Sequence, residues 1–425
     1  MVRNLHHTRD TGYLRWTWRL EADGVPVADG EWDVSVVVPG AQDRADWPDS
    51  LAKAVDTAGR GEHWLTVSAE LAADEPWADV GHTVTWTQIG PVADSTSQTV
   101  QPDASPRRGD GGRLPVPRRD GDTITLGAAR FDAITGTLVR LGELPVYGPR
   151  ADVWRAPIDN DRVSPLGAAW QQAGLDRLRH KVLQVETDDD GITVRTRMSP
   201  AGSDLGLLAD YHWSAQDGNC LVLTVDTAPL GPWPVPLPRL GVAMTVPGEF
   251  DRVTWFGLGP GEAYRDSDSA VRVGRYESTV EAMQTPYVRP QENGNRRHLR
   301  WARLTRSRLG GDGTEGTDGS GGTRGTGGTP SRPAGYGTCG IEITGSPWFD
   351  LTVKPWSTQT VQSADHTVGP EPDGLVHLDI DLEHRGLGSG SCGPSVQPRH
   401  HLAAVAARFT LRIRPVEAEA DDGVG

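Results

Sequence analysis

Short runs in which apolar and polar residues alternate, each ended by glycine or proline, constrain the fold of this chain more than any other feature. A period of two places the apolar side chains on one face of a strand. In the N-terminal part, such runs occupy residues 13–20, 31–38, 62–70 and 82–89. The pair Asp23-Gly24 after the first run is typical of a hairpin turn. With 52 glycines and 32 prolines, the chain is predicted to be an all-β protein.

The chain length of 425 residues and the stretches where the alternation is lost predict more than one domain. Residues 1–95 have the strand spacing of a small immunoglobulin-like β-sandwich. Residues 96–121 lose the alternation, contain clustered Pro, Gly and charged residues, and are predicted to be a linker. Alternation resumes at residue 122 and continues to 415, which predicts a second, larger β-sandwich. One helix is expected within this domain, over residues 166–178.

A glycine-rich stretch interrupts the second domain. Between Gly310 and Thr329, 10 of 20 residues are glycine, and such a stretch cannot bury enough apolar area to offset its ordering entropy. We therefore predict a disordered insertion over residues 310–335. The strands around Trp301 and Ile341 are expected to pair across it, because a longer loop adds little closure entropy. The acidic residues 416–425 are predicted to form a loose tail.

Charge and cysteine content limit the possible partners and compartment. A net charge of −15 without a basic stripe argues against nucleic acid, and the short clusters Arg296-Arg297 and 303–308 are interpreted as solvated surface. The chain has three cysteines, Cys220, Cys339 and Cys392. This odd number favours a reducing compartment, so a cytoplasmic location is expected. Neither a signal-peptide core nor an apolar run of 18 residues occurs, so no membrane association is predicted.

Four short motifs follow one another along the second half of the chain. They read WRAPIDND (residues 154–161), WFGLGPGEAYRD (255–266), YVRPQENGNR (287–296) and GSGSCGP (388–394). In order and spacing they resemble the motifs of the small-chain domain of family 2 β-galactosidases. Residues 3–95 more loosely resemble the immunoglobulin-like domain that precedes the small-chain domain in that family. The chain is therefore similar to the C-terminal part of such an enzyme.

The resemblance implies a galactose-mutarotase-like β-sandwich for the second domain. It also implies a retaining hydrolase of terminal β-galactose residues, such as that of lactose. The two catalytic glutamates and the magnesium ligands of the family belong to a TIM barrel that this chain does not include. The chain alone is therefore expected to have no catalytic residue and no activity. Its expected partners are a β-galactoside and a barrel-containing large chain, or a second copy of itself.

The resemblance also assigns roles to individual residues. A scaffold role is implied for Gly257, Gly259, Pro260, Glu262, Tyr264, Asp266, Glu292, Asn293 and Gly294. A place in the sugar pocket wall is implied for Arg155, Asn160, Asp161, Ser391 and Cys392. Cys392 stands where a well-studied type of the family has a tryptophan that stacks on sugar, and the alternative for it is a tight turn with a buried thiol. The backbone of Arg289 and Pro290 falls where the family binds a structural sodium.

The residues themselves leave other functions open. A retaining glycosidase needs two carboxyl groups roughly 5–5.5 Å apart. Candidates are Asp159, Asp161, Glu262, Asp266, Asp268 and Glu292. Because Asp and Glu side chains often cap turns and hold loops, a structural role is favoured for all of them.

Two functions without catalysis remain as alternatives. The 15 tryptophans suit a stand-alone carbohydrate-binding module as well as a core, and a pure assembly domain is the other possibility. The chain could be a natural small subunit or the product of an interrupted gene. Its start at Val2, without a segment that caps the first domain, favours interruption.

Overall fold

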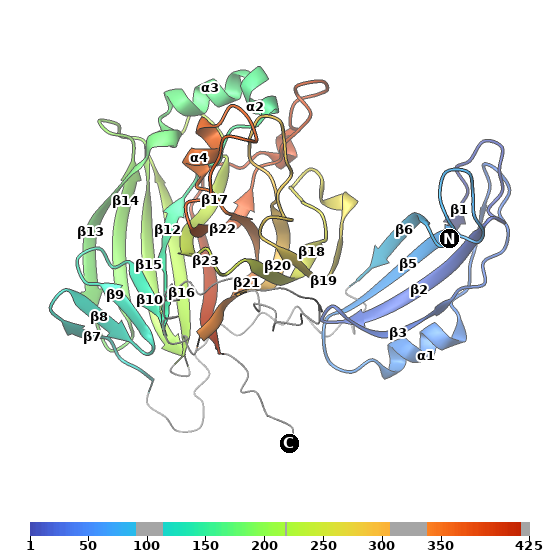
Figure 1. Cartoon of the computed structure of the whole chain (residues 1–425), viewed down its shortest axis with the longest axis horizontal. Coiled ribbons are helices and arrows are strands. Elements are labelled where there is room, and N and C mark those ends of the chain that lie inside the picture. The colour runs from blue at the N-terminus through green and yellow to red at the C-terminus, as the bar shows by residue number, and fades with distance from the viewer. Residues whose placement is uncertain (91–113, 217–218, 307–337, 418–425) are drawn as a thin grey trace, which may run out of the picture. The chain divides into compact units, whose positions relative to one another are not determined.

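The structure is a computed structural model that describes residues 1–90, 114–216, 219–306 and 338–417. Strands dominate these residues and the helices are short, which confirms the predicted all-β class (Figure 1). The chain forms two compact units, the first made mainly of the N-terminal residues. The predicted insertion 310–335, most of the tail and most of the linker lie outside the described residues. No helix among the described residues is long and apolar enough to cross a membrane.

The first unit is built on a four-stranded antiparallel sheet of order β3-β2-β5-β6. Its strands are β2 (Leu14–Ala22), β3 (Val25–Glu31), β5 (His63–Leu71) and β6 (Thr83–Ile89). Asp23 and Gly24 have positive φ and form the predicted hairpin turn between β2 and β3. A helix that was not predicted, α1 (Asp49–Thr57), places Leu51 against Trp18 and Leu20 of the sheet. The pair β1 (Val2–Arg3) and β4 (Gln42–Asp43) forms a second, two-stranded sheet.

The predicted strand over residues 31–38 is wrong, because β3 ends at Glu31 and residues 32–38 belong to no strand. This segment is held by isolated backbone bonds and by side chains rather than by a continuous strand ladder. The backbone of Val37 donates to the Thr11 hydroxyl, and its carbonyl accepts from the Asn4 side chain. Alternation alone could not distinguish this arrangement from a strand, since Val36 and Val38 point outward while Val37 is buried.

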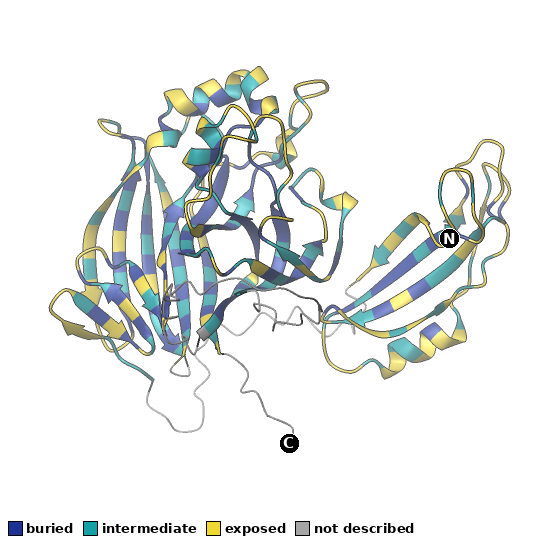
Figure 2. Ribbon diagram, in the orientation of Figure 1, coloured by how far each residue is buried: buried dark blue, intermediate teal, exposed yellow. Residues whose placement is uncertain are grey.

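A twelve-stranded antiparallel sheet makes up most of the second unit, although residues 256–260 and 269–276 group with the first unit. Its main path runs through β12 (Tyr147–Asp152), β17 (Arg239–Pro247), β22 (Leu375–His384), β21 (Thr338–Lys354), β23 (Ala407–Glu417), β16 (Cys220–Leu230), β15 (Gly206–Gln216), β14 (Ile192–Ser199) and β13 (Arg179–Thr187). From β21 a branch continues through β20 (Arg296–Thr305), β18 (Arg252–Gly259) and β19 (Arg272–Thr279). Buried and exposed residues alternate along many of these strands, as the sequence pattern predicted (Figure 2).

Two further predictions can be compared directly with the observed strands. Trp301 faces Thr344 and Leu304 faces Ile341, so β20 and β21 do pair across the predicted insertion. The predicted linker ends too late, because Arg118–Asp120 already form β7. This strand belongs to a five-stranded sheet with β8 (Thr123–Leu126), β9 (Ala129–Asp132), β10 (Leu138–Leu141) and β11 (Leu144–Pro145).

Short helices lie together at one end of the large sheet: α2 (Asp159–Val163), α3 (Pro165–Gln172) and α4 (Thr358–Ser363) (Figure 1). The helix predicted over 166–178 is shorter than expected. It stops after Gln172, because Gly174 takes a left-handed conformation before a short 3₁₀ turn, Leu175–Arg177. Trp170 of α3 is fully buried and donates from its indole nitrogen to the Pro236 carbonyl. This end of the sheet carries the candidate site.

Candidate functional site

The four motifs of the sequence meet at this end of the large sheet, and each is bonded to two of the others. Asn160 of the first motif bonds to the fourth, and the Asp159 amide donates to the Gln291 side chain of the third at 2.8 Å. Glu262 of the second motif accepts from the Gly294 amide of the third at 2.7 Å. Asp266 of the second motif accepts from the Gly388 amide of the fourth. We call these four connections the motif ring.

A buried ion pair supports α2 within the motif ring. The Arg155 guanidinium lies 2.7 Å from the Asp161 carboxylate, and both side chains are almost inaccessible. The same Asp161 carboxylate accepts from the Ile158 amide at 3.0 Å and so fixes the start of the helix. Arg155 and Asp161 were predicted to belong to the wall of the sugar pocket. The structure buries both side chains next to Asn160, and their place in that wall remains a prediction.

Asn160 joins α2 to the loop of residues 386–394. Its amide nitrogen donates to the carbonyls of Leu387 and Gly388 at 3.1 and 2.7 Å. Its amide oxygen accepts from the backbone and the hydroxyl of Ser391 at 2.9 and 2.6 Å. The structure therefore brings together the two regions that the sequence assigned to the pocket wall, which lie more than 220 residues apart.

The tip of loop 386–394 is open to solvent. Ser391 is exposed, and so is the thiol of Cys392, so the alternative of a buried thiol is wrong. The turn itself is tight, as expected, because the amides of Cys392 and Gly393 both bond to the Ser389 carbonyl. Hydroxyls, a thiol and backbone groups are what this tip can present to a polar ligand.

The second and third motifs, for which the resemblance implied a scaffold role, make mainly backbone and buried contacts. Glu262 holds a loop through a backbone amide, which is the role favoured for it from the sequence. Tyr264 is fully buried and the burial raises the pKa of its hydroxyl well above the usual value. Asn293 accepts from the Thr285 amide and donates to the Gln291 carbonyl. Strand β18 ends at Gly259, directly before Pro260, and so positions Glu262 near the third motif.

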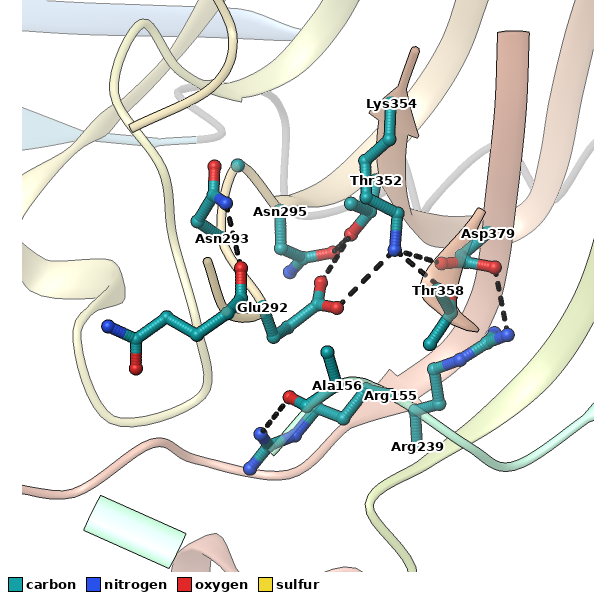
Figure 3. A network of polar contacts seen from close by, with 12 residues as sticks. Arg155, Ala156, Arg239, Glu292, Asn293, Asn295, Thr352, Lys354, Thr358 and Asp379 are labelled. Carbon is teal, nitrogen blue, oxygen red and sulfur yellow. Dashed lines mark hydrogen bonds and ion pairs between the residues drawn. The ribbon is translucent and has the colours of Figure 1, made fainter. Parts of the chain in front are cut away.

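Beneath the motif ring lies a buried network of charges that the sequence did not predict (Figure 3). The Lys354 ammonium lies 3.4 Å from Glu292 and 2.9 Å from Asp379. Arg239 in turn lies 2.8 Å from Asp379 and 2.6 Å from Asp381. Although burial opposes it, these carboxylates raise the pKa of Lys354 above its usual value. Lys354 and Arg239 therefore remain charged in the interior.

A second cluster corrects the expectation for Arg296-Arg297, since both side chains are buried rather than solvated. Arg297 pairs with Asp350 at 3.2 Å, with Glu383 at 3.0 Å and with Asp268 at 2.5 Å. Burial raises the pKa of Asp350 to about 7 despite its contact with Arg297. Local sequence carries no signal for this outcome, because the carboxylates come from other strands and from a 3₁₀ turn.

The candidate carboxylates are all engaged in contacts within the chain. Asp159 contacts Arg162 and Gln291, while Asp161 contacts Arg155. The remaining candidates each contact a backbone amide or a basic side chain: Glu262, Asp266, Asp268 and Glu292. Each of the six therefore has at least one partner within the described residues, and a structural role for them remains a prediction.

The predicted sodium position can be assessed by its donors. The Pro290 carbonyl lies 3.5 Å from the guanidinium of Arg162, and a second cation, Arg289, lies close enough to lower the pKa of Arg162 together with burial. A carbonyl that faces a guanidinium does not fit a sodium ion. Among the described residues, no group of three or more His, Cys, Asp or Glu side chains is placed to hold a metal.

Fold and motif ring together define the chain as an all-β protein whose second unit is a small-chain-type sandwich. The family described as "Beta galactosidase small chain" matches residues 127–413, and "Beta-galactosidase, domain 4" matches residues 1–90. The chain belongs to the β-galactosidase family, and within it corresponds to the C-terminal part.

Curated relatives agree with this assignment. A β-galactosidase of Arthrobacter sp. (strain B7) is 33% identical over 450 residues, covering 97% of this chain and 39% of the relative. One from Vibrio cholerae is 32% identical over 386 residues, covering 83% and 32%. The chain thus spans about two fifths or less of the length of these relatives.

Among solved structures, a GalM/aldose epimerase homologue from C. elegans matches with a TM-score of 0.34 and 9% identity. The match covers 72% of this chain and 99% of that one. A TM-score this low carries no argument about function, and the all-β class rests on the strand topology of the chain itself.

Proposed function

We propose that this chain is the scaffold and pocket-wall portion of a β-galactosidase that removes terminal β-D-galactose residues, as from lactose. The reaction would be the two-step retaining hydrolysis, in which one carboxylate forms a glycosyl-enzyme and another acts as acid and base. The observation that carries the proposal is the motif ring, because it joins all four motifs at one site.

It follows that the catalytic carboxylates come from outside this chain. A barrel-containing partner chain would supply them, together with the magnesium site. The contribution of this chain would be the edge formed by Asn160, Ser391 and Cys392, whose amide, hydroxyl and backbone groups suit a hydroxyl-rich sugar. We further propose a cytoplasmic location, which is supported by the low and odd number of cysteines, three in 425 residues. The net charge of −15 supports a role without nucleic acid.

The proposal can be tested with a chimera in which this chain replaces the matching segment of the Arthrobacter sp. β-galactosidase. The intact relative and this chain alone are the controls, and the readout is hydrolysis of a chromogenic β-galactoside. The chimera should turn over the substrate, whereas the chain alone should not.

Two results would contradict the proposal. Turnover by the purified chain alone would show that its own carboxylates are catalytic. A chimera that unfolds cooperatively, like the intact relative, but has no activity would show that this chain cannot supply the missing wall.

A further inference from the structure

Loop 386–394 is held from two sides by residues that do not belong to it. On one side, Asn160 makes four hydrogen bonds to Leu387, Gly388 and Ser391. On the other side, the two carboxylate oxygens of Asp266 accept from the amides of Leu387 and Gly388 at 3.0 and 2.6 Å. Both the carbonyls and the amides at the base of the loop are therefore bonded to fixed partners.

Both partners are themselves anchored. Asn160 lies on α2 next to Asp161, which is locked by the buried Arg155. Asp266 lies in the same motif as Glu262, which bonds to the Gly294 amide. The positions of both partners are thus set by buried or backbone contacts, and their bonds can fix the loop before any ligand arrives.

The base of the loop leaves no room for another arrangement. A Cβ at Gly386 would lie 2.7 Å from the Asp266 carboxyl carbon. Gly388 has a φ of +66°, and a Cβ there would lie 2.6 Å from the Val396 side chain. The close approach of Asp266 to the backbone thus depends on glycine at position 386, directly before the two amides to which Asp266 bonds.

We propose that Asn160 and Asp266 are positioning residues that hold loop 386–394 in one pre-ordered shape, so that its exposed tip at Ser391 and Cys392 forms a rigid edge of the sugar site. The proposal rests on the proposed function for the identity of the ligand. The ordering of the loop itself does not depend on it. Neither residue takes part in bond cleavage; each acts through the geometry of the loop.

Cys392 provides a direct probe of loop order in the chain alone. A nitroxide spin label would be attached to Cys392 after the half-buried Cys220 and Cys339 are changed to serine. The label should be more mobile in Asn160→Ala and Asp266→Asn than in the parent. The matched controls Asn219→Ala and Asp189→Asn alter exposed residues away from the loop and should leave the spectrum unchanged. Equal mobility in all five proteins would overturn the proposal, whatever the activity of the enzyme.

The same variants in the active chimera test whether the fixed shape of loop 386–394 improves substrate binding. We expect KM for the chromogenic galactoside to rise at least fivefold for Asn160→Ala and Asp266→Asn, with kcat changed less and the melting temperature nearly unchanged. A variant that merely misfolds would lower the active fraction and hence kcat, but not raise KM. An unchanged KM would overturn the positioning role. An inactive parent chimera would instead count against the proposed function, while the spin-label result would still decide the order of the loop.

Discussion

At the residue scale, Lys354 shows how the site depends on charges held far from water. Its ammonium neutralises Glu292 and shares Asp379 with Arg239. Lys354→Met would leave Glu292 buried without its cationic partner and Asp379 with Arg239 alone, which costs about 3–5 kcal/mol of unfolding free energy. Urea unfolding of the purified chain measures the loss. The exposed Lys181→Met is the matched control and should change stability by less than about 0.5 kcal/mol. Equal midpoints for the two variants would contradict the assigned role of Lys354.

His298 makes stability depend on pH. Burial, followed by the charges of Arg297 and Arg300, lowers its pKa from 6.5 to about 4. The unfolded chain therefore takes up a proton near pH 6.5, whereas the folded chain takes it up only near pH 4. The free energy of unfolding consequently falls as the pH drops through this window. Asp350, with a raised pKa, acts in the opposite direction.

A variant separates the contribution of His298 from that of Asp350. His298 has a φ of +53°, which asparagine tolerates, so His298→Asn removes the titration without straining the backbone. Between pH 7 and pH 5, the variant should lose about 1–2 kcal/mol less unfolding free energy than the parent. Asp350 is present in both proteins, so its effect cancels in the comparison. Parallel pH profiles would show that His298 does not titrate as inferred.

At the element scale, β22 explains why turn-forming and loop-holding roles could be proposed for the motif residues, whereas the buried network around Lys354 could not be predicted. In β22, Asp379, Asp381 and Glu383 alternate with apolar residues, which locally indicates a strand with one solvated face. The structure buries Asp379 and Asp381 because Arg239 reaches them from a strand about 140 residues away. The ring, by contrast, consists of motif residues whose turn-forming and loop-holding chemistry is local and could be recognised.

The same distinction applies to the first unit. Strands β2 and β5 were predicted because their alternation agrees with one buried and one exposed face. Helix α1 was missed, although Leu51, Ala54 and Val55 follow helical spacing and pack in one apolar cluster with the sheet. The pairing of β20 with β21 was predicted correctly because both strands kept their alternation on either side of the insertion.

At the scale of the whole molecule, the last strand of the chain completes the large sheet. β23 lies between β16 and β21, pairing Leu223 with Leu411 on one side and Ile343 with Ile413 on the other. The most C-terminal strand of the described residues therefore joins two groups of strands that come earlier in the sequence. Antiparallel pairing of this kind is non-local, so the second unit should fold only when its C-terminal residues are present.

Truncation tests this dependence. Ending the chain after Ala406 removes β23 and with it the buried Phe409, Leu411 and Ile413, each of which contributes roughly 1.5–3 kcal/mol by burial. Their sum is comparable with the typical net stability of a domain, about 5–15 kcal/mol, and β16 and β21 would also become open edges. We expect the amides of both strands to lose protection from hydrogen exchange. Ending the chain after Glu417 retains β23 and should preserve that protection. If both truncated chains kept equal protection, the two groups of strands would be stable without the strand that joins them.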